Sequence, residues 1–200
     1  MIQTERGTAY DVRFLRKDVA VAIVVLIALG LGLLLRFQTT GRTTTFQDKD
    51  TGLSITYPAT WSSADSLQDV LLKVEDPQAN SAFKTALTVE TRALDPQNPP
   101  TLQDLEDRRV AQHGALTGYH FLSTNPATVG GAKAMQQEYA YTVQPIDQPR
   151  RASLPVVVHA LEYLVLGKEN VYYITLAAPS NEFADARAQM DQIIQTVTVR

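Results

Sequence analysis

The sequence predicts an α+β protein in which an antiparallel β-sheet is flanked by helices and preceded by one N-terminal transmembrane helix. Three observations lead to this fold class. Residues 19–35 form a run without a charge, an amide or a proline. Beyond residue 45, most of the chain alternates apolar and polar residues with the period of two that is typical of half-buried strands. Two segments interrupt this alternation with helical spacing, one midway and one near the C-terminus.

The apolar run is the first element of the chain. At about 1.5 Å per residue it spans roughly 25 Å as a helix, slightly less than a hydrocarbon core of about 30 Å. Phe37 and the long side chains of Lys17 and Arg36 at its two ends can make up the difference. A cleavable signal peptide is the competing interpretation, but no small-residue cleavage site follows the run. The absence of cysteine also excludes a lipoprotein anchor. We therefore expect an uncleaved signal anchor.

The expected organisation is a cytoplasmic leader over residues 1–18, a transmembrane helix over 19–36, a threonine-rich tether over 37–44 and an extracytoplasmic domain over 45–200. The orientation follows from the short leader and the large domain behind the helix. The basic residues near the helix are Arg6, Arg13, Arg16 and Lys17 before it, and Arg36, Arg42 and Lys49 after it. We expect the protein in the cell membrane as a single-pass protein, in contact with membrane lipid.

Charge divides the chain in the same way. Residues 1–42 contain six basic and three acidic side chains, whereas residues 43–200 contain 12 basic and 18 acidic ones. An acidic domain is a poor candidate for binding nucleic acid, because phosphates favour clustered Lys and Arg. The absence of cysteine removes thiol chemistry and cysteine-based metal sites.

Three strands are predicted in the first part of the domain. Each shows apolar residues on alternate positions, and the first stops at Pro58. The alternating residues are Leu53, Ile55 and Tyr57, then Val70, Leu72 and Val74, then Leu87, Val89 and Thr91.

A helix follows, with Thr101 as its N-cap and Gly114 at its end. Asp104 lies three residues after Thr101, in the position of a capping-box partner. One mixed face is expected to carry Leu102, Leu105, Arg109 and Val110.

Two hairpins and a second helix complete the domain. The first hairpin joins strands over residues 119–123 and 133–143 through Gly130-Gly131, a pair typical of tight turns. The second joins residues 154–166 and 171–178 through residues 167–170. The final helix starts at residues 179–181, and residues 196–199 are expected to form a last short strand. The apolar face of that helix carries Phe183, Ala186, Met190, Ile193 and Ile194.

Several of these segments resemble PsbP-like domains, in which a strand ends in Tyr-Pro and a Trp follows within a few residues. The similar segments are Phe46-Gln47-Asp48, Gly52 to Trp61, Gly130 to Ala134, Tyr172 to Leu176 and Phe183 to Val199. The resemblance covers roughly residues 45–199 and implies an α/β/α sandwich, a domain shared with Ran-binding Mog-type proteins. It further implies a generally non-catalytic protein that docks on a partner, as the extrinsic photosystem II proteins of this family do. The transmembrane helix sets this chain apart from those proteins.

Catalytic and metal sites are not indicated by the sequence. It lacks nucleotide-binding loops and nucleophile elbows, and His113, His120 and His159 have no metal or triad spacing. His113 at a helix end is interpreted as a favourable cation for the helix dipole, and the other two as strand residues. A cluster of His159 with Glu162 or Glu138 across paired strands is left open. The carboxylates expected to form solvated surface are Asp48, Asp50, Asp65, Asp69, Glu75 and Asp76. We expect no enzyme activity, no cofactor and no metal.

Interaction candidates come from charge and from residue size. Trp61 is interpreted as a core residue rather than a ligand-stacking one. Ala28 and Gly32 lie four residues apart on the anchor and could pack against another helix. The partner-contact candidates are Arg108 and Arg109 on the first domain helix, and Arg150 and Arg151 in a proline-containing loop.

These features favour a non-catalytic accessory subunit that docks on, stabilises or helps to assemble a larger membrane protein complex. Complexes of photosynthetic or respiratory electron transfer are among the candidates. Integral membrane subunits are its expected partners. The alternative is a membrane-tethered module that binds a small ligand or lipid in a groove between sheet and helices. A hydrolase is a third hypothesis without a nucleophile and base to support it.

Overall fold

The computed structural model describes residues 16–64, 70–79, 81–144 and 154–199. The chain divides into two compact units, Met1–Gly41 and Arg42–Arg200. Among the described residues, the first unit contains one helix, and the second contains the strands and two further helices.

The helix of the first unit is α1, Arg16–Thr40. The large apolar side chains described between residues 19 and 34 are exposed, from 48% for Val19 to 68% for Leu26. Within the part of the chain that the structure describes, no helix meets the length and hydropathy needed to cross a membrane.

The expected tether over residues 37–44 is replaced by regular structure. Helix α1 continues to Thr40, and strand β1, Thr43–Gln47, begins three residues later. The threonines of β1 face a second strand, and Thr45 hydrogen-bonds Thr56 through their hydroxyls at 2.9 Å. A threonine-rich segment has high strand propensity, and a neighbouring strand was available to pair with it.

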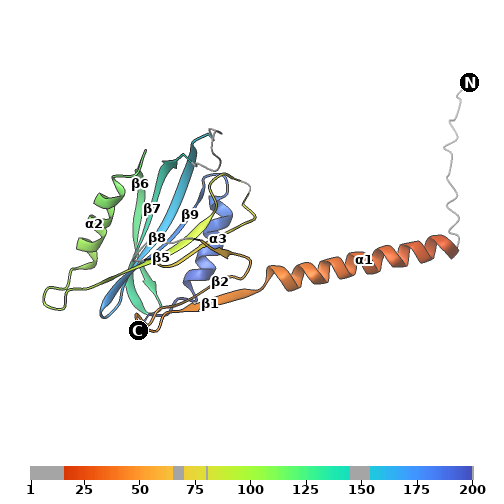
Figure 1. Ribbon diagram of the computed structural model, residues 1–200, viewed down its shortest axis with the longest axis horizontal. Helices are drawn as coiled ribbons and strands as arrows, with labels where there is room; N and C mark the ends of the chain where they lie inside the picture. Colours follow the sequence, from red (N-terminus) through yellow and green to blue (C-terminus); the bar gives the residue numbers. More distant parts are fainter. Residues whose placement is uncertain (1–15, 65–69, 80, 145–153, 200) are drawn as a thin grey trace, which may run out of the picture. The chain divides into compact units, whose positions relative to one another are not determined.

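The strands of the second unit form two antiparallel sheets (Figure 1). The small sheet pairs β1 with β2, Ser54–Pro58. The large sheet has the order β3-β4-β5-β9-β8-β7-β6. Its strands are β3 (Ser62–Ser63), β4 (Val70–Glu75), β5 (Ala86–Ala93), β6 (His120–Val129), β7 (Ala132–Val143), β8 (Val156–Leu166) and β9 (Asn170–Pro179).

The large sheet is covered on both faces, which confirms the α+β class and the α/β/α layering. Helix α3, Phe183–Ile194, packs on one face together with β2, and α2, Leu102–His113, lies on the other (Figure 1). The main core lies on the α3 side and includes Trp61, as predicted. The α2 side has two smaller apolar clusters, one around Leu105 and one around Tyr139.

Helix α3 follows its predicted apolar face, and α2 follows its predicted cap; of the mixed face predicted for α2, Leu105 and Arg109 are buried, whereas Leu102 and Val110 are half-buried. The five residues that α3 buries are the five predicted for its apolar face. Helix α2 has the predicted capping box, in which Thr101 Oγ1 accepts from the Asp104 amide at 3.1 Å and Asp104 Oδ2 accepts from the Thr101 amide at 2.9 Å. The predicted strand over residues 196–199 is wrong in extent, because only Thr198 forms a bridge, to Ser54.

The hairpin between β6 and β7 turns through Gly130-Gly131, as predicted. Both glycines have positive φ, 57° and 81°, which two-residue hairpin turns of this hand require. Strand β6 is longer than expected and forms one edge of the large sheet. It contains Pro126 and has a register irregularity at Leu122.

Candidate functional site

Helix α2 turns an unusually polar face to the sheet. Its buried residues are Leu105, Glu106, Arg109 and His113, so only one of the four is apolar. Polar side chains at this spacing still lie on one helix face. Helix α2 therefore places a guanidinium, a carboxylate and an imidazole against the strands below it.

The sheet meets this helix with a row of polar side chains. Register pairs align Thr88 with Thr175, Thr175 with Glu162, and Glu162 with Gln137 across β5, β9, β8 and β7. Glu162 and Gln137 are 0% and 1% exposed. Because side chains alternate between the faces of a strand, the apolar neighbours of Glu162 point into the α3-side core.

Arg109 connects the helix to this row. Its Nε and Nη2 atoms donate to Glu162 Oε1 at 2.9 and 2.7 Å, and its Nη1 and Nη2 donate to the two oxygens of Glu90, each at 3.1 Å. Thr175 Oγ1 also donates to Glu162 Oε1, at 2.8 Å. The guanidinium lies 4.5 Å from the ring centroid of Tyr173, a cation-π distance.

The cluster shifts the pKa values of its members. Burial alone would lower the pKa of Arg109, but the carboxylates of Glu162 and Glu90 outweigh burial and raise it, so the residue stays charged. Burial lowers the pKa of His113, and the attraction of Glu162 only partly offsets this. His113 is therefore a buried neutral imidazole near pH 7, and the expectation of a cation at the helix end is wrong.

The polar groups around α2 are incompletely paired. Among the described residues, the buried side-chain atoms without a hydrogen-bond partner are Glu106 Oε2, His113 Nδ1, Tyr119 OH, both amide atoms of Gln137 and Glu162 Oε2. His113 Nε2 lies 3.8 Å from Glu162 Oε2, beyond hydrogen-bond distance. Unpaired buried polar atoms are rare in folded proteins, so their concentration beside α2 makes this region the candidate site.

A hollow of about 820 Å³ adjoins this cluster, and we call it the α2 trough. Small side chains on β5 and β9 form its floor, with Ala86 paired to Ala177 and Thr88 to Thr175. Helix α2 contacts strands β8 and β7, which follow β5 and β9 in the strand order of the large sheet. The trough is lined by Lys73, Glu75, Ala82, Phe83, Lys84, Ala86, Thr88, Glu90, Arg109, Gln112, His113, Ala115, Leu116, Tyr139, Tyr141, Val143, Thr175 and Ala177.

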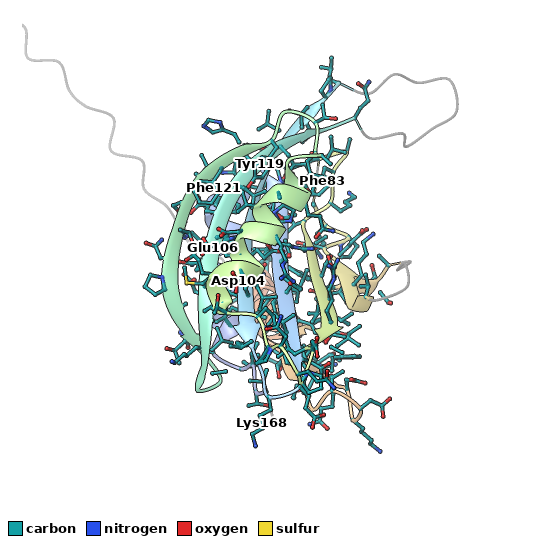
Figure 2. All side chains as sticks on the ribbon, turned by 90° about the vertical axis from the view of Figure 1, so that its left-hand side faces the viewer. Phe83, Asp104, Glu106, Tyr119, Phe121 and Lys168 are labelled. Carbon is teal, nitrogen blue, oxygen red and sulfur yellow. The ribbon has the colours of Figure 1, made fainter. Side chains whose placement is uncertain are left out.

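Aromatic rings form one wall of the trough. The ring of Tyr139 lies 4.3 Å from His113 and 6.1 Å from Tyr141, measured between centroids. Burial raises the pKa of Tyr141 to about 12, so its hydroxyl remains neutral. Figure 2 shows Phe83 and Tyr119 at the same end of α2, far from Asp104 at the other end. The trough thus opens beside the C-terminal end of the helix.

The structure separates the predicted contact residues. Arg108 is exposed and lines a second hollow, of about 510 Å³, together with Arg92 and Tyr173. Arg109 is 6% exposed, and its charge is used within the fold. Arg150 and Arg151 lie outside the described residues.

The two small residues of α1 are exposed. Ala28 and Gly32 both face solvent in this chain, and a Cβ atom added at Gly32 would meet nothing within 4 Å. Their proposed role in helix packing stays a prediction.

The histidines do not gather. His159 packs edge-on against Phe183 of α3 at 4.9 Å, whereas Glu162 faces α2, so these two residues do not form a cluster. His120 is exposed at the start of β6. Among the described residues, no group of three or more histidines and carboxylates is arranged to hold a metal ion.

The sequence interpretation considered Glu162 only as a possible partner of His159 and missed its pairing with Arg109, although one signal was available. Residues 156–166 are almost entirely apolar, and a single carboxylate in such a run must find a buried partner. The partner, Arg109, lies 53 residues away. Only the tertiary fold identifies the pair.

The comparisons with known proteins find similarity in structure but not in sequence. No family model matches the sequence, and no curated protein does. Solved structures do match. Cyanobacterial PsbP (CyanoP) from Synechocystis sp. PCC 6803 aligns with a TM-score of 0.60 at 13% identity, covering 79% of this chain and 92% of that one. The domain has the PsbP-like fold.

Two further structures share this PsbP-like fold. LpqN from Mycobacterium tuberculosis, described as involved in cell envelope biogenesis, has a TM-score of 0.57 at 12% identity, with 79% and 90% of the two chains covered. The Ran-binding protein Mog1p from Saccharomyces cerevisiae has a TM-score of 0.50 at 10% identity, with 79% and 95% covered. At identities this low, the structural similarity establishes the fold of the domain but does not establish its function.

Proposed function

We propose that this chain is a non-catalytic accessory protein that is tethered to the cell membrane by α1 and presents its PsbP-like domain on the extracytoplasmic side to an integral membrane partner. The observation that carries the proposal is the apolar run of residues 19–35. The exposure of its side chains supports it, because large apolar side chains left uncovered on a helix require lipid or another protein around them. Mog1p, a Ran-binding protein, is an example of the same fold serving in binding.

Helix packing is the proposed mode of partner contact within the membrane. Ala28 and Gly32 leave one side of α1 without bulk, which permits close approach of a second helix. Arg108, exposed on α2, is the proposed contact of the domain.

Purification of the tagged full-length protein in mild detergent, with identification of its stoichiometric companions, tests this function. We expect membrane-protein companions that are lost when Ala28→Leu and Gly32→Leu are combined. They should be retained in the control Ile27→Leu, which keeps the apolar character of α1. A protein that purifies alone, or companions unaffected by the double variant, would contradict the proposal.

The absence of cysteine allows a direct test of topology. Lys168→Cys places one thiol in the exposed turn between β8 and β9. We expect a membrane-impermeant maleimide to label this variant in intact cells. Labelling only after lysis would place the domain in the cytoplasm.

A second candidate function, binding of a small ligand, is favoured by the α2 trough. Its volume of about 820 Å³ lies within the usual range for ligand sites, and apolar rings line it beside a few polar groups. This function predicts that a ligand raises the unfolding temperature of the full-length protein, and that replacing Ala177 by Leu in the trough floor abolishes the increase.

A further inference from the structure

Charge is unbalanced where the α2 trough meets the buried cluster. Glu90 and Glu162 share one guanidinium, that of Arg109, and His113 beside them is neutral. Two lysines also line the trough: Lys73 pairs with Glu75 at 3.3 Å, and Lys84 donates to the carbonyl of Ala79, and no ion pair of either lysine with Glu90 or Glu162 is found among the described residues. Within the hydrogen-bonded group of Glu90, Glu162 and Arg109, two carboxylates share one cation, and a partly buried carboxylate in such a group favours a further cation beside it.

The accessible part of that excess charge faces the trough. Glu90 has a side chain that is 26% exposed and lines the trough, whereas Glu162 lies at 0% exposure beneath it. His113 also lines the trough, is only 7% exposed, and has a ring nitrogen without a hydrogen-bond partner among the described residues. A ligand group with N–H donors would bind the carboxylate oxygens of Glu90, which accept hydrogen bonds.

The aromatic wall favours the same kind of group. The rings of His113, Tyr139 and Tyr141 follow one another at centroid distances of 4.3 and 6.1 Å, and all three line the trough. Aromatic faces attract cations within about 6 Å, and groups of such rings bind organic ammonium ions. The cluster already contains one contact between a cation and an aromatic ring, that of Arg109 with Tyr173.

We propose that the α2 trough binds the ammonium group of a small organic amine, with Glu90 as its counter-ion and the rings of Tyr139 and Tyr141 beside it. The small side chains of Ala86 and Ala177 leave room for its alkyl part. This inference rests on the second candidate function, because it names the ligand chemistry of that site.

Three probes of the same length test the chemistry: n-butylammonium, n-butanol and n-butyrate. Titration of the full-length protein in detergent by calorimetry at constant ionic strength gives the affinity for each. We expect saturable binding of n-butylammonium, with n-butanol and n-butyrate each about tenfold weaker or undetectable.

Two variants locate the binding. Glu90→Gln removes the counter-ion but retains an oxygen for Arg109, and Tyr141→Leu removes a ring without changing charge. Each should weaken n-butylammonium binding about tenfold. The matched control is Glu138→Gln, which removes a carboxylate that pairs with Arg187. It should leave the affinity unchanged. Because the two variants act through different groups, misfolding of one leaves the other as a test.

Each other outcome overturns a different statement. Equal binding of n-butanol and n-butylammonium at the trough would refute the ammonium proposal and keep the site as a ligand site. No saturable binding of any probe would refute both. Binding of n-butylammonium that neither trough variant changes would show that the amine binds elsewhere.

Discussion

Arg109 donates two hydrogen bonds to a single oxygen of Glu162, Oε1, at 2.9 and 2.7 Å. The other oxygen of the same carboxylate has no hydrogen-bond partner among the described residues. This asymmetry makes the ion pair dependent on one oxygen, in a place from which water is largely excluded. The consequences for stability can be measured.

Removing one member of this pair should be strongly destabilising. Glu162→Leu leaves the buried Arg109 with Glu90 as its one remaining carboxylate partner among the described residues, and we expect a loss of about 3 kcal/mol or more in the free energy of unfolding. The double variant Arg109→Met/Glu162→Leu should lose less than the sum of its single variants. Urea unfolding of the full chain, followed by the fluorescence of its one tryptophan, the buried Trp61, gives these values. The control is Glu138→Leu, whose partner Arg187 has a 42% exposed side chain; its loss should stay near 1 kcal/mol or below.

The capping box at α2 should contribute a smaller amount. Thr101→Ala removes the acceptor for the Asp104 amide, and we expect a loss of about 1 kcal/mol. Thr101→Ser keeps the hydroxyl and should restore most of it. Equal unfolding free energies for the alanine and serine variants would show that the cap does not stabilise the domain.

Stability should depend on pH through His113. Burial holds the pKa of His113 below its value in the unfolded chain, about 6.5. The unfolded state therefore binds the proton first as the pH falls, so stability is fully present above about pH 6.5 and decreases from there down to the folded-state pKa. His113→Gln should remove this part of the pH dependence in urea unfolding curves recorded from about pH 7.5 to about pH 5. His120→Gln, at an exposed position of β6, should leave it in place.

The two glycines of the β6–β7 turn should differ in their tolerance of alanine. Both have positive φ, which strains any residue with a Cβ by about 1–2 kcal/mol. At Gly130 the added Cβ would also lie 2.7 Å from the carbonyl oxygen of Val197, whereas at Gly131 nothing lies within 4 Å. Gly130→Ala should therefore lower the unfolding temperature more than Gly131→Ala. The reverse order would contradict this contact.

The sequence predicted those elements that depend on local patterns. The apolar face of α3, the capping box of α2 and the Gly130-Gly131 turn each follow from residues close together in the chain. Strand β1 was missed because threonines permit both a tether and a strand, and only pairing with β2 decides. Arg109 was placed on a mixed face of its helix with Leu102 and Leu105, and was also interpreted as a partner contact. Glu162 and Glu90, which fix its role, belong to strands that only the fold brings beneath α2.

Strand β6 forms one edge of the large sheet and is irregular along its length. The opposite edge, β3, has only two residues, so β6 is the long edge among the described strands. A long edge normally offers a template on which a second chain can extend the sheet. Pro126 has no N–H to donate, and the irregularity at Leu122 breaks the regular spacing of backbone groups. The edge that leaves Phe121 and Leu122 exposed is therefore a poor template for pairing with a strand of another chain.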